Sequence, residues 1–143
     1  GKLAAQLSET EKQLAQAKRD LAKVRFSELL DSAQAVNGSR VLVAEVNADS
    51  PDLMREMSDW FRSKYPSGAI VLGSVINDKP SLLVAVSQDL NKKGVDAGKL
   101  IKEIAAVVGG GGGGRPNLAQ AGGKDAAKLG EALDKARSLL ANV

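Results

Sequence analysis

The chain has 143 residues, a formal net charge of +3 and 43% apolar residues, which is enough for one modest domain with its own core. It contains neither cysteine nor histidine, which excludes disulfides, thiolate or histidine metal sites, and Ser-His or Cys-His nucleophile pairs. Aromatic residues make up only 3%, so base stacking is not the expected main means of binding. We expect no cofactor, no metal ion, no catalytic centre and, without a long apolar run, no membrane partner.

Residues 3 to about 35 predict one long helix with the heptad spacing of a coiled coil, and we expect residues 1–37 to form a helical subdomain. Leu7, Leu14 and Leu21 repeat every seven residues, and Val24 fills an intermediate position of the same seam. A stripe this narrow suits a helix that pairs with another helix. The equally weighted alternative is that the helix folds back onto its own domain. Because the sequence opens in this pattern without an initiator methionine, we expect a piece of a longer protein.

Residues 38–143 predict a globular part in which short apolar strands alternate with amphipathic helices. Two helices carry start signals, Ser50 with Pro51 for the first and Asp96 for the second. After the long helix the expected order is β-α-β-β-α-(glycine loop)-β-α, with strands at 40–46, 68–78, 80–90 and 117–121 and helices at 51–65, 96–108 and 124–143. We therefore expect an α+β or α/β fold with one small mixed sheet.

The segment "GGGGGGRPNLAQAGG", residues 109–123, is the most unusual part of the sequence. Glycine lets other atoms approach the main chain, and successive exposed N–H groups form concavities that bind anions. Ordering six glycines costs on the order of 10 kcal/mol in backbone entropy, so packing or a ligand has to compensate. The equally weighted alternative is a flexible linker. No Lys-Ser or Lys-Thr pair follows the run, so it is not a Walker A phosphate loop.

The candidate nucleic-acid contacts are bare main-chain positions and the cationic or amide side chains near them. The Arg115 guanidinium can donate two hydrogen bonds to a phosphate, and Pro116 stiffens the chain after it. Lys93 lies in a turn near the end of the expected hairpin and extends the basic surface. The full set is Gly112, Gly113, Gly114, Arg115, Asn117, Gln120, Gly122, Gly123, Lys124 and Lys93.

The strings "AGKLIKEIA" and "GGGGGGRPNLAQAGG", followed by an amphipathic helix, resemble the C-terminal domain of alanyl-tRNA synthetases. This module belongs to the Asp-His-His-associated domain family, which certain phosphoesterases share. The string "IVLGSVINDKPSLLVAVSQDL" and the long N-terminal helix resemble the same domain, so the likeness covers essentially the whole chain. The sequence departs from the family in two ways: Asn117 replaces the usual Asp, and the glycine run contains no lysine or other residue.

The resemblance implies a noncatalytic appendage that binds the outer corner of tRNA, where the D and T loops meet. There it helps the catalytic and editing domains of the same enzyme use one tRNA in the cytoplasm. A second interpretation is an assembly module, because in parts of the family the helix mediates dimerisation. A third is the substrate-binding domain of a phosphoesterase, in which residues 109–114 and Arg115 hold the substrate phosphate.

Overall fold

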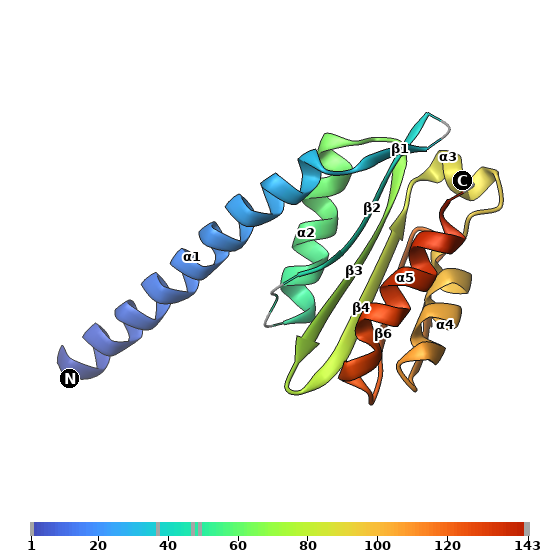
Figure 1. Ribbon diagram of the computed structural model, residues 1–143. Helices are drawn as coiled ribbons and strands as arrows, with labels where there is room; N and C mark the ends of the chain where they lie inside the picture. The colour runs from blue at the N-terminus through green and yellow to red at the C-terminus, as the bar shows by residue number, and fades with distance from the viewer. Residues whose placement is uncertain (1, 37, 47, 49, 142–143) are drawn as a thin grey trace.

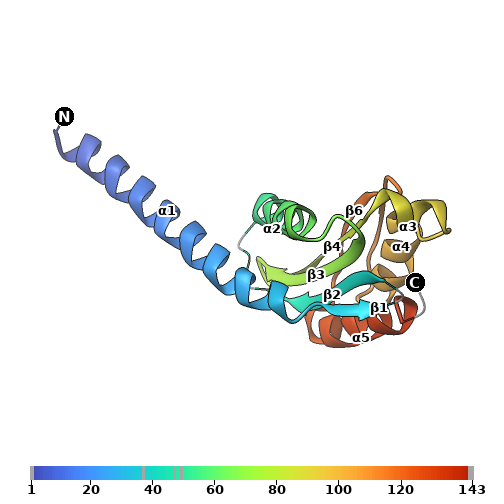
Figure 2. The same cartoon turned by 90° about the horizontal axis from the view of Figure 1, so that it is seen from above.

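The computed structural model describes residues 2–36, 38–46, 48 and 50–141, with side chains described from residue 10 onward. A long helix projects from a six-stranded sheet, and shorter helices cover both faces of that sheet (Figure 1). Figure 2 shows these layers from above. The leading helix and the mixed sheet are those expected from the sequence, and the α/β-type fold is confirmed.

The long helix α1 (Lys2–Asp31) has a free half and a packed half. Its last turns pack beside helix α2 (Pro51–Lys64), and there Phe26 is 1% and Leu30 is 6% exposed. Residues 10–20 are exposed along their whole length, and this part of the helix extends away from the domain (Figure 1). The two alternatives for the heptad seam therefore concern different parts of one helix, because only its C-terminal turns fold back onto the domain.

Six strands form one mixed sheet: β1 (Gln34–Val36), β2 (Ser39–Glu45), β3 (Gly68–Ile76), β4 (Lys79–Val86), β5 (Gly111–Gly114) and β6 (Leu118–Gly122). Their order across the sheet is β1-β2-β3-β4-β6-β5. Strands β2 and β3 are parallel, and every other neighbouring pair is antiparallel. β3 and β4 form the expected hairpin. It is closed by Asn77 and Asp78, whose φ angles of 53° and 65° fit a type I′ turn.

Side chains alternate between the two faces of the sheet, and each face builds its own core. On β3, Ile70 and Leu72 pack with α1 and α2, whereas Ala69 and Val71 pack with the helices of the opposite face. All four side chains are fully buried. The helical segments that follow the hairpin are α3 (Gln88–Lys92), α4 (Ala97–Val107), η1 (Ala126–Lys128) and α5 (Leu129–Leu139). Of these, α4 and α5 cover the second face.

The two expected helix starts are confirmed by their capping hydrogen bonds. The Ser50 hydroxyl accepts a hydrogen bond from the Leu53 N–H at 3.3 Å, and proline occupies the first turn of α2. The Asp96 carboxylate accepts one from the Lys99 N–H at 3.2 Å at the start of α4. These caps fix where each helix begins on its face of the sheet.

Three stretches adopt local structure that the sequence pattern did not indicate. The segment expected to be a glycine loop contains strand β5, which pairs with β6 at the edge of the sheet. Glycine has little strand preference of its own, so this strand depends on its neighbour. Residues 87–90, expected to continue a strand, instead lead into α3. Residues 34–36, expected to belong to the helical subdomain, instead form the short strand β1, which pairs with β2 at the other edge of the sheet.

Asp89 stabilises the junction where β4 ends and α3 begins through side-chain hydrogen bonds. Its carboxylate accepts hydrogen bonds from the Ser67 and Ser87 hydroxyls. The Ser87 hydroxyl also accepts a hydrogen bond from the Gly68 N–H at 3.0 Å, which joins the start of β3 to this cluster. The hydrogen bond from Ser67, followed by that from Ser87, lowers the pKa of Asp89 from its ordinary value of 3.8.

We expect acid to weaken this junction. Because the folded-state pKa of Asp89 is lowered, its stabilising contribution is fully present above pH 3.8 and is lost as the pH falls through the folded-state value. Denaturant unfolding at a series of acidic pH values should show a steeper loss of unfolding free energy for the unmutated chain than for Asp89→Asn. Asp59→Asn, which removes an exposed carboxylate from α2, is the matched control. Equal slopes for the unmutated chain and Asp89→Asn would refute the assignment.

Candidate nucleic-acid interface

The glycine segment forms the last strand of the sheet, and no further strand lies outside it in the described part of the chain. All four residues of β5 are exposed. The strand pairs with β6 from Gly111 opposite Gly122 to Gly114 opposite Ala119. Helix α4 lies against it, so close that a Cβ on Gly98 would stand 3.1 Å from the Gly114 carbonyl oxygen. The main chain of β5 is therefore supported by α4 and β6 and remains accessible from solvent.

Some glycines in this segment are required by packing. A Cβ on Gly112 would stand 2.5 Å from the Cβ of Ala121, and one on Gly110 would stand 1.8 Å from the Gly122 carbonyl oxygen. Gly114 is enclosed in the same way, because a Cβ there would stand 2.7 Å from a main-chain carbonyl oxygen of β6. Real Cβ atoms do not approach other heavy atoms this closely. Any other residue at these three positions would push β5 away from β6.

Gly111 and Gly113 are different, because nothing in the fold requires glycine there. A Cβ on Gly111 would meet no heavy atom within 4 Å, and one on Gly113 would meet only the Lys102 side chain, at 4.0 Å. Neither residue has a positive φ angle. A serine or threonine would fit both positions and would favour the strand. The absence of side chains at these two exposed positions leaves the peptide groups open to a molecule approaching from outside.

The turn after β5 is fixed by hydrogen bonds from α2 and α3, and its Arg115 side chain is exposed. The Asn91 side-chain amide donates to the Pro116 carbonyl at 2.8 Å, and the Arg62 guanidinium donates to the Asn117 carbonyl at 2.8 Å. Arg115 and Asn117 are exposed. Among the described residues, the Arg115 guanidinium has neither an ion pair nor a hydrogen bond. A rigid turn thus presents a cation beside the exposed main chain.

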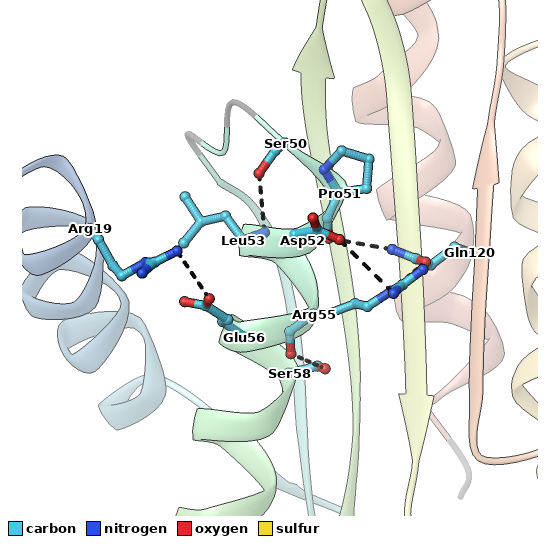
Figure 3. A network of polar contacts seen from close by, with 9 residues as sticks. All are labelled: Arg19, Ser50, Pro51, Asp52, Leu53, Arg55, Glu56, Ser58 and Gln120. Atoms are coloured by element: carbon cyan, nitrogen blue, oxygen red, sulfur yellow. Dashed lines mark hydrogen bonds and ion pairs between the residues drawn. The ribbon is translucent and has the colours of Figure 1, made fainter. Parts of the chain in front are cut away.

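Gln120 faces helix α2, which the sequence did not indicate (Figure 3). Its carbonyl Oε1 accepts a hydrogen bond from Arg55 Nε at 2.8 Å, and its Nε2 donates to the Pro51 carbonyl at 3.5 Å. Arg55 also lies 3.9 Å from the Asp52 carboxylate. The predicted contact residue Gln120 is therefore part of a polar network that places the Arg55 guanidinium over β6, next to the glycine strand.

Gly122, Gly123 and Lys124 lie at the opposite end of the strand pair from Arg115. The N–H of Gly123 donates to the Pro80 carbonyl at 3.0 Å, and the N–H of Lys124 donates to a neighbouring main-chain carbonyl at 2.9 Å. These two amides are thus used within the fold. The glycines here border an open hollow of about 420 Å³, and the Lys79 and Lys124 side chains also line it. At this end a ligand would meet ammonium groups rather than free amides.

Lys93 caps the C-terminal end of α3 and is exposed. The same helix contacts the Arg115 turn through Asn91. The structure therefore brings Lys93 to the side of the interface where the turn lies, while Lys124 stands at the other end.

Three cations that border the glycine strand were missed by the sequence reasoning: Arg55, Arg62 and Lys102. Arg55 and Arg62 are seven residues apart, so on a helix they share one face, and this spacing was visible in the sequence. The sequence did not show that this face of α2 points toward β6. Lys102 is exposed on α4, and only the packing of α4 against β5 places it beside Gly113.

The heptad seam of α1 forms a second surface. Leu14 is 57%, Leu21 50% and Val24 60% exposed, and the Leu7 side chain lies outside the described residues. Leu21 also borders an open groove of about 710 Å³ between α1, α2 and the sheet, where Val75 is 44% exposed. These apolar side chains are available to another helix.

Among the residues whose side chains the structure describes, no three acidic side chains gather as a bound metal ion would require. In the same part of the chain, none of the helices combines the length and the apolar character needed to cross a bilayer.

The two classes of glycine predict opposite effects of the same substitution. Gly112→Ala should lower the free energy of unfolding by about 1–3 kcal/mol, because its Cβ collides with β6. Gly111→Ala should leave it unchanged or raise it by up to about 1 kcal/mol, because the site is open and the unfolded chain loses freedom. Denaturant unfolding of the two variants checks this. Equal destabilisation by both would contradict the division into packed and open glycines.

Comparison with known proteins identifies the family. A family model described as the DHHA1 domain matches residues 38–142. The chain is 48% identical over 131 residues to an alanine–tRNA ligase from Exiguobacterium sibiricum, and 46% identical over 136 residues to one from Nostoc sp.. These matches cover 92% and 94% of this chain but only 15% and 16% of the relatives. The chain thus corresponds to a small part of each ligase.

Solved structures give the same result. The C-Ala domain of Aquifex aeolicus alanyl-tRNA synthetase matches with a TM-score of 0.68 and 29% identity, covering 77% of this chain and 98% of that domain. A DHH-domain protein described as a member of the s1p family of ribosomal proteins shares only the fold, with a TM-score of 0.54 and 19% identity over 94% of this chain and 33% of that protein. The resemblance carried by the glycine motif is confirmed. The chain belongs to the DHHA1 domain family.

Proposed function

We propose that this chain is a noncatalytic tRNA-binding module of a cytoplasmic alanyl-tRNA synthetase. It contacts the outer corner of tRNA and helps the catalytic and editing domains of the same enzyme use one tRNA molecule. The names of the similar ligases and of the C-Ala domain support this assignment. So does the sequence, which lacks the histidine and cysteine of most catalytic centres.

The observation that carries the proposal is the open main chain at Gly111 and Gly113. Packing explains Gly110, Gly112 and Gly114, but it does not explain the absence of side chains at the two positions between them. An exposed edge without side chains lets the phosphates and sugars of a folded RNA approach the peptide groups closely. The Arg115 guanidinium stands directly after the strand and carries the charge that a phosphate requires.

The cations around the strand extend this contact over a surface. Arg55 and Arg62 border it from α2, Lys102 from α4, and Lys124 lies at its far end. Because they come from separate elements, they suit a broad, folded polyanion better than a single phosphate. Such binding depends on shape and phosphate contacts, and it weakens as salt increases.

A phosphoesterase substrate domain is the weaker interpretation. The DHH-domain neighbour shares the fold at 19% identity, whereas the ligases are 46–48% identical over nearly the whole chain.

Arg115→Ala should weaken tRNA binding about tenfold, because a charge-assisted hydrogen bond to phosphate is lost. It should also reduce the slope of log affinity against log salt by about 1. Anisotropy of a labelled tRNA transcript, titrated at several salt concentrations, measures both quantities.

Lys135→Ala is the matched control, since it removes an exposed cation from α5 and should leave the affinity nearly unchanged. If Arg115→Ala binds tRNA as tightly as the unmutated chain at low salt, Arg115 is not a contact. If the unmutated chain does not bind tRNA at all, the proposed function fails.

A second role, pairing of α1 with the helix of another copy, is favoured by the exposed seam. Leu14, Leu21 and Val24 are each at least half exposed. Leu14 lies on the free half of the helix, and Leu21 borders the groove beside α2. An apolar stripe on a projecting helix is stabilised when a second helix buries it. This role is compatible with tRNA binding, because the seam and the glycine strand belong to different elements.

Leu14→Lys should convert a dimer to a monomer, because it places a charge in the centre of the seam. Gln13→Lys adds the same charge beside the seam and should leave the dimer intact. Sedimentation velocity over a range of concentrations distinguishes them. A monomeric unmutated chain throughout that range would exclude the role.

A further inference from the structure

The junction of α1 and α2 contains a hollow with an aromatic wall. It has a volume of about 460 Å³, and Trp60, Phe26, Lys23, Lys64, Ser27 and Ser63 contribute to its lining. Phe26 is buried beneath, with its ring centroid 5.8 Å from that of Trp60. Trp60 itself is only half buried. The largest aromatic side chain of the protein therefore stands between a buried support and the solvent.

The Lys23 side chain lies over one face of the Trp60 ring. The Lys23 ammonium lies 5.9 Å from the ring centroid, a cation–π distance, and Lys23 is exposed. An ammonium on a flexible side chain reaches the ring only where no protein atoms cover it. A planar group from another molecule can displace Lys23 and stack in its place.

The charged groups that line the hollow are both cationic. Lys23 covers the ring, and Lys64 stands at the rim, where its hydrogen bond to Asp31 raises the pKa of its ammonium. Ser27 and Ser63 add hydroxyls that can donate or accept hydrogen bonds. Because the Asp31 carboxylate already pairs with Lys64, Lys23 is the cation that can meet a phosphate. An aromatic face beside this ammonium suits an aromatic ligand that carries negative charge nearby, such as a nucleobase with its phosphate.

The hollow is within reach of the glycine strand, because α2 borders both. Arg55 extends from α2 toward β6, whereas Glu56 pairs with Arg19 of α1 at 3.3 Å (Figure 3). Arg62 extends to the same side as Arg55, and Trp60 faces α1. The path over the exposed side of a helix about 10–12 Å across is half its circumference, roughly 16–19 Å. A loop of several nucleotides in an RNA bound at the glycine strand can therefore extend across α2 and place one nucleotide in the hollow.

We propose that the Trp60 hollow holds an unpaired nucleobase of the same RNA that the glycine strand contacts by its backbone, which rests on the proposed function. The glycine strand then recognises backbone and shape, and Trp60 detects an unstacked base. Double-stranded RNA offers phosphates but keeps its bases stacked. The module would therefore distinguish a folded RNA with open loops from a plain duplex.

The sequence contains a single tryptophan, so its fluorescence reports on this hollow alone. We expect tRNA to quench Trp60 fluorescence and to protect it from acrylamide. A blunt RNA duplex of similar length should bind through its phosphates, as followed by anisotropy of a labelled strand, without changing Trp60. Binding of tRNA without a change at Trp60, or an equal change with the duplex, would overturn the inference and leave the proposed function standing. Absence of tRNA binding by anisotropy would remove both.

Substitutions give an independent test. Trp60→Leu keeps an apolar side chain but removes the aromatic face, and it should weaken tRNA binding about tenfold with little effect on the duplex. Trp60→Phe keeps a ring and should bind tRNA more tightly than Trp60→Leu. Lys23→Glu should weaken tRNA binding, whereas Lys12→Glu, the same change on the free half of α1, should not. Equal losses for tRNA and duplex in Trp60→Leu would indicate a structural role and contradict the inference.

Discussion

The close contact between the glycine strand and its neighbours determines the shape of the whole interface. Residues 110–114 lie so near to β6 that Gly110, Gly112 and Gly114 have no room for a Cβ. Because the two strands stay together, the turn between them projects Arg115 at the sheet edge and presents the Pro116 carbonyl to its neighbours. The entropy lost in ordering these glycines is offset by strand pairing and by the packing of α4 against β5. A linker of the same composition would leave the arginine without a fixed position.

Much of the frame could be predicted from local signals, whereas the site depended on tertiary contacts. Ser50 and Asp96 mark helix starts because their side chains bond main-chain groups three residues ahead, which a sequence can show. The glycine run gives no such signal, since a residue without a side chain has neither periodicity nor strand preference. The strand that pairs with it, β6, is only a few residues long, so its sequence pattern indicates no more than a brief strand. Arg62 reaches the Asn117 carbonyl only because α2 turns this face toward β6. The seven-residue spacing of Arg55 and Arg62 does not determine that orientation.

Helix α2 lies between the glycine strand and helix α1, and different interactions hold its two sides. Toward β6 it contributes hydrogen bonds from Arg55 and Arg62. Toward α1 it forms the Arg19–Glu56 ion pair, whose side chains are 57% and 37% exposed. An exposed pair of this kind contributes about 0–1 kcal/mol. Burial of Phe26 and Leu30 against the domain is therefore what holds the last turns of α1, and the free half, which buries nothing among its described residues, takes its direction from them.

The purity of the glycine run follows from the two-residue period of a strand. Alternate residues of β5 face different surroundings, so one set meets β6 and the other meets solvent. Folding requires glycine in the first set, because any Cβ would collide with the neighbouring main chain. In our proposal, binding requires it in the second set, because a side chain would keep the RNA backbone away from the peptide groups. Two separate demands on alternating positions therefore combine into an uninterrupted run from Gly110 to Gly114, and neither demand alone would produce it. Gly109, which precedes them, has a φ of 70°, a conformation that favours glycine.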